Sequence, residues 1–172
     1  MISRRRLLLS AAAAPLMLGG CKVRTINYFP VNPATVRFVN VMYPAVGLDG
    51  VHLDTVVWTD LGFEGAADYV EFDNNLTTFG VRVTGTATDL GTAEETLAGE
   101  QPYTLVLMGT LSNPSATLLA EVANAPTNGN IQLSVFNAAV NNGAVDIYVT
   151  APGADITQLN PNYFNVSYNG VS

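Results

Sequence analysis

The sequence has few of the side chains that enzymes commonly use for chemistry. Its 172 residues include one cysteine, Cys21, and one histidine, His52. A zinc site needs about four Cys, His or carboxylate ligands. No Gly-x-Ser-x-Gly elbow accompanies the few serines, and the glycines are scattered among turns instead of forming a phosphate-binding loop. We therefore expect a protein that is not an enzyme and that has no cofactor, with His52 facing solvent or a neighbouring strand.

Positive charge is also scarce. Seven basic residues stand against 14 acidic ones, and three of the seven are Arg4, Arg5 and Arg6. Removal of an N-terminal signal would leave four basic residues and a net charge of −10. Such a surface repels the phosphates of nucleic acids, so we expect no nucleic-acid partner. Because 48% of the residues are hydrophobic, the chain is too apolar for disorder and can bury a core.

The first 20 residues have the layout of a bacterial export signal. The arginines precede an apolar run from Leu7 to Leu18, which is shorter than the roughly 20 residues that a membrane-spanning helix needs. Leu18-Gly19-Gly20-Cys21 resembles the lipobox of bacterial lipoproteins, in which the signal is cut before a lipidated cysteine. The resemblance makes Cys21 the lipid-bearing first residue of the mature chain. It leaves no thiol for catalysis or for a disulfide.

Two further features bear on the route of export. Ser3-Arg4-Arg5-Arg6-Leu7-Leu8 resembles a twin-arginine signal, and an ordinary Sec signal with three arginines is the alternative. Lys22 follows the cysteine, where an aspartate would indicate retention at the inner membrane of a Gram-negative bacterium. We expect an exported protein of the cell envelope, lipid-anchored at the outer membrane of a Gram-negative bacterium.

The remainder of the sequence predicts an all-β protein. Residues 21–34 have no apolar period and are interpreted as a lipid-anchored tether. Short runs rich in Val, Thr, Tyr and Phe then alternate with Gly, Asn, Asp and Pro, which is typical of an antiparallel immunoglobulin-like β-sandwich. We assign this domain to residues 35–125. Its expected strands are Val36–Val41, Val51–Trp58, Asp68–Phe72, Phe79–Thr84, Glu94–Leu97, Tyr103–Gly109 and Thr117–Val122.

The side-chain pattern indicates where the core lies. Val36, Phe38 and Asn40 share one face of the first strand, and Arg37 lies on the other. Trp58 is expected between the two sheets. Ala116–Ala125 is the segment that would best tolerate a helix.

A second, incomplete β unit is predicted over 131–172. Val39-Asn40 is followed nine residues later by Asp49, and Phe136-Asn137 is followed nine residues later by Asp146. Its expected strands are Ile131–Phe136, Val145–Thr150 and Tyr163–Tyr168. Three strands leave an open edge and an uncovered face. Either the sequence is a fragment of a longer protein, which we favour, or these strands join the first unit in one sheet.

The strand pattern resembles the bacterial domain of unknown function 4397 over most of residues 35–122, and more weakly over 131–168. Its most specific part is Leu97-Ala98-Gly99-Glu100-Gln101-Pro102-Tyr103-Thr104, which leads into a strand. The resemblance implies a secreted or surface protein with tandem immunoglobulin-like units, and it implies no reaction or catalytic residue. Many members have a Ser-Pro-Asp turn after the first strand, where this chain has Met42-Tyr43-Pro44.

Acidic and aromatic side chains are the remaining candidates for a site. Paired carboxylates can act as acid and base, and Asp73-Asn74-Asn75 offers oxygens for calcium, although it is also a common turn. The carboxylates considered are Asp49, Asp54, Asp60, Glu64, Asp68, Glu71 and Asp73. Their spacing is that of strand faces and turns, so we assign no catalytic or metal-binding residue. The loop aromatics that could meet a partner are Tyr28, Phe29, Tyr43, Trp58, Phe63, Tyr163 and Phe164.

These observations favour a cell-envelope lipoprotein with a non-catalytic immunoglobulin-like module for binding or adhesion. Its expected partners are the membrane, through lipid on Cys21, and a protein or glycan at the cell surface. The alternatives are a structural stalk or spacer for further domains and a hydrolase that uses surface carboxylates.

Overall fold

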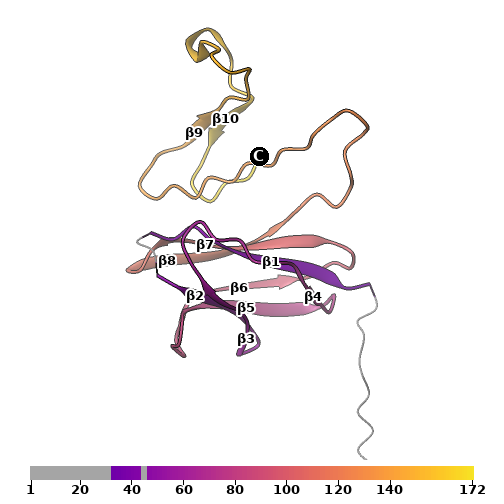
Figure 1. Cartoon of the computed structure of the whole chain (residues 1–172), viewed down its shortest axis with the longest axis vertical. Helices are drawn as coiled ribbons and strands as arrows, with labels where there is room; N and C mark the ends of the chain where they lie inside the picture. The colour runs from indigo at the N-terminus through magenta and orange to yellow at the C-terminus, as the bar shows by residue number, and fades with distance from the viewer. Residues whose placement is uncertain (1–31, 44–45) are drawn as a thin grey trace, which may run out of the picture.

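β-Strands make up nearly all of the regular structure (Figure 1). The computed structural model describes residues 32–43 and 46–172. The predicted signal, Cys21 and most of the predicted tether lie outside these residues. Within them, no helix is both long enough and apolar enough to cross a membrane.

Two four-stranded sheets form a sandwich, with strand orders β4-β1-β7-β8 and β3-β2-β5-β6. The predicted all-β immunoglobulin-like sandwich is confirmed, with eight strands instead of seven. Neighbouring strands are antiparallel except β1 and β7, which run parallel. A parallel pair needs a long connection, and here that connection includes the strands of the other sheet. The bounds are β1 (Ala34–Asn40), β2 (Leu48–His52), β3 (Thr55–Leu61), β4 (Val70–Phe72), β5 (Leu76–Val83), β6 (Asp89–Thr96), β7 (Pro102–Thr110) and β8 (Asn113–Ala120).

The prediction of one strand over Val51–Trp58 is wrong. The chain turns at Leu53 and Asp54, whose φ angles are 45° and 64°, and β2 pairs with β3 as a hairpin. Two-residue hairpin turns with positive φ are usually marked by Asn-Gly or Asp-Gly. Leu-Asp lacks this mark, so the turn was missed.

Other boundaries also differ from the predictions, such as the start of β6 at Asp89 where Glu94 was expected. Ala34, placed at the end of the tether, is the fully buried first residue of β1. The helix-tolerant segment Ala116–Ala125 is strand up to Ala120, and β8 begins at Asn113. Pro114 is compatible with this strand because β8 lies at the edge of its sheet.

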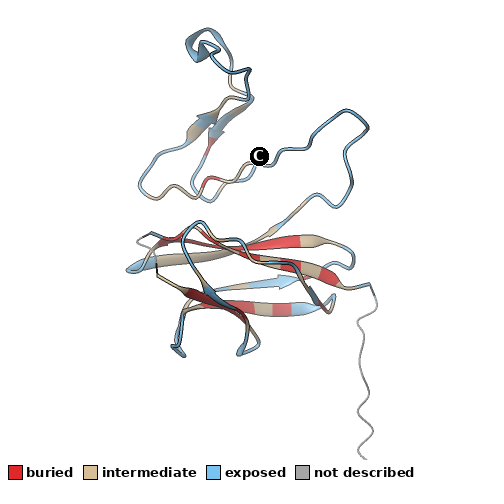
Figure 2. Ribbon diagram, in the orientation of Figure 1, coloured by how far each residue is buried: buried red, intermediate tan, exposed pale blue. Residues whose placement is uncertain are grey.

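Apolar side chains, several of them aromatic, fill the space between the two sheets, and the buried residues of the sandwich strands are red in Figure 2. Trp58 lies there as predicted, 6% exposed, and its Nε1 donates to the Asp68 carbonyl at 3.0 Å. Its ring centroid is 6.2 Å from that of Phe38 and 5.9 Å from that of Phe72. The alternation predicted for the first strand is confirmed, since Val36, Phe38 and Asn40 are buried and Arg37 is on the opposite face.

The carboxylate of Asp49 in β2 is buried and accepts hydrogen bonds from β3 and from the loop after β5. Its Oδ1 accepts hydrogen bonds from Thr59 Oγ1 at 3.1 Å, Asp60 N at 2.9 Å and Thr84 Oγ1 at 3.0 Å. Its Oδ2 accepts from Gly85 N at 3.3 Å. Burial raises the pKa of the carboxyl, but these four donors lower it, and the pKa lies below its usual value.

Beyond β8 the chain forms a smaller, more exposed segment (Figures 1 and 2). It contains β9 (Val145–Ile147), β10 (Tyr163–Val166) and a 3₁₀ turn at Ile156–Gln158. β9 and β10 pair with each other and join neither sheet of the sandwich. The predicted strand Ile131–Phe136 forms only one bridge among the described residues, between Phe136 and Val171, because no continuous partner strand lies beside it.

We predict that Gly50→Ala destabilises the sandwich. An added Cβ would lie 2.6 Å from Trp58 Cε3 and 3.2 Å from Phe38 Cδ1, and such overpacking costs about 1–3 kcal/mol. Urea unfolding followed by tryptophan fluorescence measures the change. Gly62→Ala is the matched control, because its Cβ would meet nothing within 4 Å. Equal stability of the two variants would contradict the packing described here.

We further predict that Asp49→Asn lowers the free energy of unfolding at pH 7 by about 1–3 kcal/mol. Because the folded pKa is depressed, the stabilisation by Asp49 is complete above the unfolded value of about 3.9 and is lost as the pH falls through the folded value. The difference from the natural protein should therefore shrink in urea titrations below about pH 4. Glu71→Gln, at an exposed position of β4, is the control, and a pH-independent difference for Asp49→Asn would refute the assignment.

Candidate functional site

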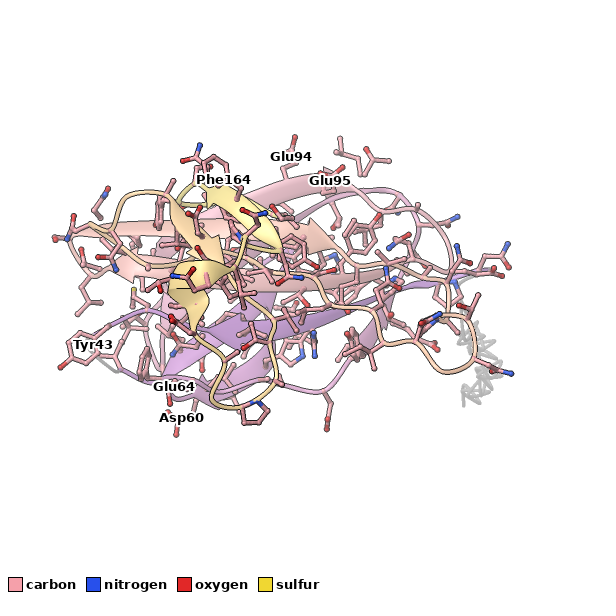
Figure 3. The ribbon with its side chains drawn as sticks, turned by 90° about the horizontal axis from the view of Figure 1, so that it is seen from above. Tyr43, Asp60, Glu64, Glu94, Glu95 and Phe164 are labelled. Carbon is pink, nitrogen blue, oxygen red and sulfur yellow. The ribbon has the colours of Figure 1, made fainter. Side chains whose placement is uncertain are left out.

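The acidic side chains considered from the sequence do not converge on one site. Asp49 accepts its four hydrogen bonds from β3 and from the loop after β5, so it links parts of the sandwich. Asp54 accepts from Arg82 Nη2 at 2.7 Å. The same guanidinium binds Asp89 through Nε at 2.5 Å. Figure 3 shows Asp60 and Glu64 at one side of the molecule and Glu94 and Glu95 at another. Across residues 32–43 and 46–172, no group of three or more His, Cys, Asp or Glu side chains could hold a metal ion.

The remaining sequence candidates have structural contacts. His52 is half-buried, with Nε2 2.6 Å from Thr77 Oγ1 and its ring 4.7 Å from that of Phe72. Burial lowers the pKa of His52 and the charge of Asp73 opposes this, so the ring is neutral at pH 7. Asp73-Asn74-Asn75 forms the turn between β4 and β5, with Asn75 N donating to the Asp73 carbonyl at 2.9 Å.

A groove of about 800 Å³ lies between the outer face of the β4-β1-β7-β8 sheet and the segment after β8. Val39 and Val106 come from neighbouring strands of the sheet, and Leu119 from β8. The opposing wall is formed by residues 132–136 and Val171. The central strand β7 is buried on both faces because its inward side chains meet the other sheet and its outward ones lie under this segment. The groove is therefore mainly apolar along its length.

A polar cluster lies beside the apolar part of the groove. Arg37 and Thr104 are directly paired on β1 and β7, and their outward side chains are joined by an Arg37 Nε to Thr104 Oγ1 hydrogen bond of 2.9 Å. Thr104 Oγ1 in turn donates to Glu121 Oε1 at 2.5 Å, and Arg37 Nε lies 3.4 Å from the same oxygen. The hydroxyl of Tyr69 donates to both Glu121 oxygens at 2.8 Å.

The positive charge of Arg37 and the negative charge of Glu121 balance each other within this cluster. The Arg37 guanidinium carbon lies 5.1 Å from the centroid of the Tyr69 ring, within the range of a cation–π contact. Burial raises the pKa of Tyr69, and the hydrogen bond to Glu121 and the charge of Glu121 raise it further. The hydroxyl therefore stays protonated and remains a donor. Such a cluster can orient a polar group of a ligand.

This site was not predicted from the sequence. The alternation of the first strand placed Arg37 on its outer face, and Arg37 is one of the few basic residues beyond the predicted export signal. Tyr69, Thr104 and Glu121 come from three other places in the chain, and no spacing in the sequence joins them. Of the loop aromatics considered, Tyr43 and Phe63 form an exposed edge-to-face pair 5.8 Å apart, away from this cluster.

Comparison with known proteins identifies a family. None of the curated proteins compared with the sequence matches it. Among solved structures, the C-terminal domain of AlgF from P. aeruginosa is similar, with 20% identity, 53% of this chain and 100% of that chain covered, and a TM-score of 0.41. A family profile matches residues 34–148, which span the whole sandwich and β9. The chain therefore belongs to the family described as Domain of unknown function (DUF4397).

Proposed function

We propose that this protein is a non-catalytic module of the bacterial cell envelope, lipid-anchored through Cys21, that binds an extended segment of a polypeptide. The groove above β1, β7 and β8 is the observation on which this proposal rests. Ligand sites are typically concave and mostly apolar with a few fixed polar groups, and the groove has this character. The polar cluster at Arg37 and Glu121 supplies the fixed groups.

The chemistry of the lining favours a polypeptide over a glycan. Sites that stack sugar rings use aromatic side chains. Among the described residues that line the groove, most are aliphatic and Phe136 is the one aromatic residue. Aliphatic side chains such as Val106 and Leu119 offer contact area for the apolar side chains of a peptide. A hydrolase is disfavoured because the side chains of Asp49 and Asp54 already accept hydrogen bonds within the sandwich, and because the acidic residues do not converge on one site.

The anchor is proposed from the sequence alone. An acidic mature chain is repelled by anionic lipid head groups, so a stable attachment requires acyl chains. Several chains on one residue hold a protein far more firmly than a single chain. The lipobox-like Leu18-Gly19-Gly20-Cys21 provides that residue.

The binding proposal is tested by titrating the mature protein with synthetic ten-residue peptides of alternating apolar and threonine residues, and with the N-acetylglucosamine tetramer. We expect the peptides to shift methyl NMR signals of Val39, Val106 and Leu119. Leu119→Asp should weaken binding about tenfold or more, the equivalent of roughly 1.4 kcal/mol. Leu76→Asp is the control, because Leu76 is exposed on the other sheet. Binding of the tetramer alone, or of no peptide, would overturn the proposal.

For the anchor, we predict that Cys21→Ala leaves the precursor unlipidated and uncut by the lipoprotein signal peptidase. Mass spectrometry of the membrane fraction checks the mass of the N-terminal peptide. Ser10→Ala, which keeps both the apolar run and the cysteine, should be processed normally. A free thiol at Cys21 in native membranes would refute the anchor.

A further inference from the structure

We propose that the bound polypeptide adds to the groove as a β-strand, parallel to residues 132–137 and in the register that β7 takes beside β1. This inference rests on the proposed function and specifies how its partner binds. It follows from hydrogen bonds of the sandwich that recur in the segment after it, and from one edge of that segment that has no backbone partners among the described residues.

The hydrogen bonds around Asn40 recur around Asn137. In both places the asparagine N–H donates to a glycine carbonyl, its own carbonyl accepts from the residue before that glycine, and its side-chain amide reaches a carbonyl four residues before the glycine. Around Asn40 the partners are Gly65 O (3.0 Å), Glu64 N (2.8 Å) and Leu61 O (2.9 Å). Around Asn137 they are Gly170 O (3.1 Å), Asn169 N (2.8 Å) and Val166 O (3.0 Å).

An aspartate and a pair of strands also recur in the segment after the sandwich. Asp49 accepts from Asp60 N at 2.9 Å, and Asp146 accepts from Asn165 N at 2.8 Å. The pairs of β2 with β3 match those of β9 with β10: Leu48–Leu61 with Val145–Val166, and Gly50–Trp58 with Ile147–Tyr163. Residues 131–137 therefore occupy the place of β1, and 145–147 and 163–166 occupy the places of β2 and β3.

The first strand of the sandwich, β1, is more deeply buried than the corresponding residues 131–137. The inward side chains Ala34 and Val36 of β1 are fully buried, whereas their counterparts Ile131 and Leu133 are 87% and 46% exposed. β1 lies between β4 and β7. Residues 135–137 have backbone partners on the side that corresponds to β4, with Val135 and Ser172 exchanging two hydrogen bonds of 3.0 Å.

The opposite edge is open. On that edge of β1, Thr35 N donates to the Gln101 carbonyl and Val41 N to the Leu107 carbonyl, which are the contacts that join β1 to β7. The counterparts of Thr35, Arg37 and Val39 are Gln132, Ser134 and Phe136. Within the described part of the chain, none of these three makes a backbone hydrogen bond. All three line the groove.

An unpaired strand edge is a template for another extended chain, and its main-chain hydrogen bonds supply affinity while alternate side chains supply specificity. The outer face of the sheet provides the contact for those side chains, through Val39, Val106 and Leu119. The occupant is therefore an extended segment of another polypeptide with apolar alternate residues. In the first copy, the strand beside β1 is β7 (Pro102–Thr110), so the sequence of β7 is a model for the peptide that would bind beside residues 132–137.

The test uses a peptide with the sequence of residues 101–110, followed by two lysines for solubility, and the intact mature protein. The alternation of a strand directs the N–H of Leu105 to the same side as the Gln101 and Leu107 carbonyls, and that of Val106 to the other side, toward β8. N-methylation at Leu105 should weaken binding about tenfold or more relative to N-methylation at Val106. Equal effects of the two methyl groups would overturn the strand addition.

Direction is tested with a nitroxide on either end of the same peptide. The parallel register places Pro102 beside Gln132 and Leu107 beside Asn137, by analogy with Thr35–Pro102 and Asn40–Leu107. An N-terminal label should broaden amide signals near Gln132, and a C-terminal label those near Asn137. The reverse pattern would refute the parallel register while leaving the proposed function intact.

Protein variants test the edge itself. Ser134→Pro removes an N–H from the open edge, and Ser134→Ala keeps it. We expect the first to reduce affinity about tenfold or more and the second to leave it unchanged. If Ser134→Pro does not fold, the N-methyl peptides still decide the question. Groove binding that is indifferent to all these changes would overturn the inference alone, whereas no binding of any peptide would overturn the proposed function too.

Discussion

The packing of Trp58 between Phe38 and Phe72, directly over Gly50, is the contact on which the rest of the structure depends. It sets the distance between the two sheets, since a Cβ at position 50 would lie 2.6 Å from the indole. It also links β1 and β4 of one sheet to β2 and β3 of the other. With one cysteine in the chain, no disulfide within the chain can replace this packing. The buried carboxylate of Asp49 adds hydrogen bonds from β2 to Asp60 and Thr84 in the β3-β2-β5-β6 sheet and its loops.

This packing uses only the inward faces of the sheets, so the outward face of β1, β7 and β8 is free for another role. Its side chains are apolar at Val39 and Val106 and become polar at Arg37, Thr104 and Glu121. The segment after β8 lies over this face without pairing to it, which leaves a groove instead of a second interface of side chains. A surface that is aliphatic along its length and hydrogen-bonding at one part suits an extended chain better than a reacting small molecule.

The strands that alternate clearly could be predicted from the sequence, because burial of one face imposes a period of two. Val36, Phe38 and Asn40 are examples, and so is the place of Trp58 in the core. The turn at Leu53-Asp54 could not be predicted, since its positive φ angles are imposed by hairpin pairing instead of by turn-forming residues. The candidate site was missed for a different reason: Arg37, Tyr69, Thr104 and Glu121 are far apart in the sequence and meet only through the pairing of β1 with β7 and the path of the chain after β8.

The sequence by itself determined the fold class, the acidic surface and the lack of a recognisable catalytic motif, because these depend on composition and on local periodicity. It also contained the repeated asparagine and aspartate of positions 40, 49, 137 and 146. Only the tertiary structure decided what the repetition means physically. Asn40 and Asn137 make equivalent hydrogen bonds, yet the strand that ends at Asn40 has neighbours on both sides. In the part of the chain that the structure describes, the segment that ends at Asn137 has one open edge. Whether a backbone group is paired depends on which chain segments lie beside it, and that neighbourhood exists only in the folded molecule.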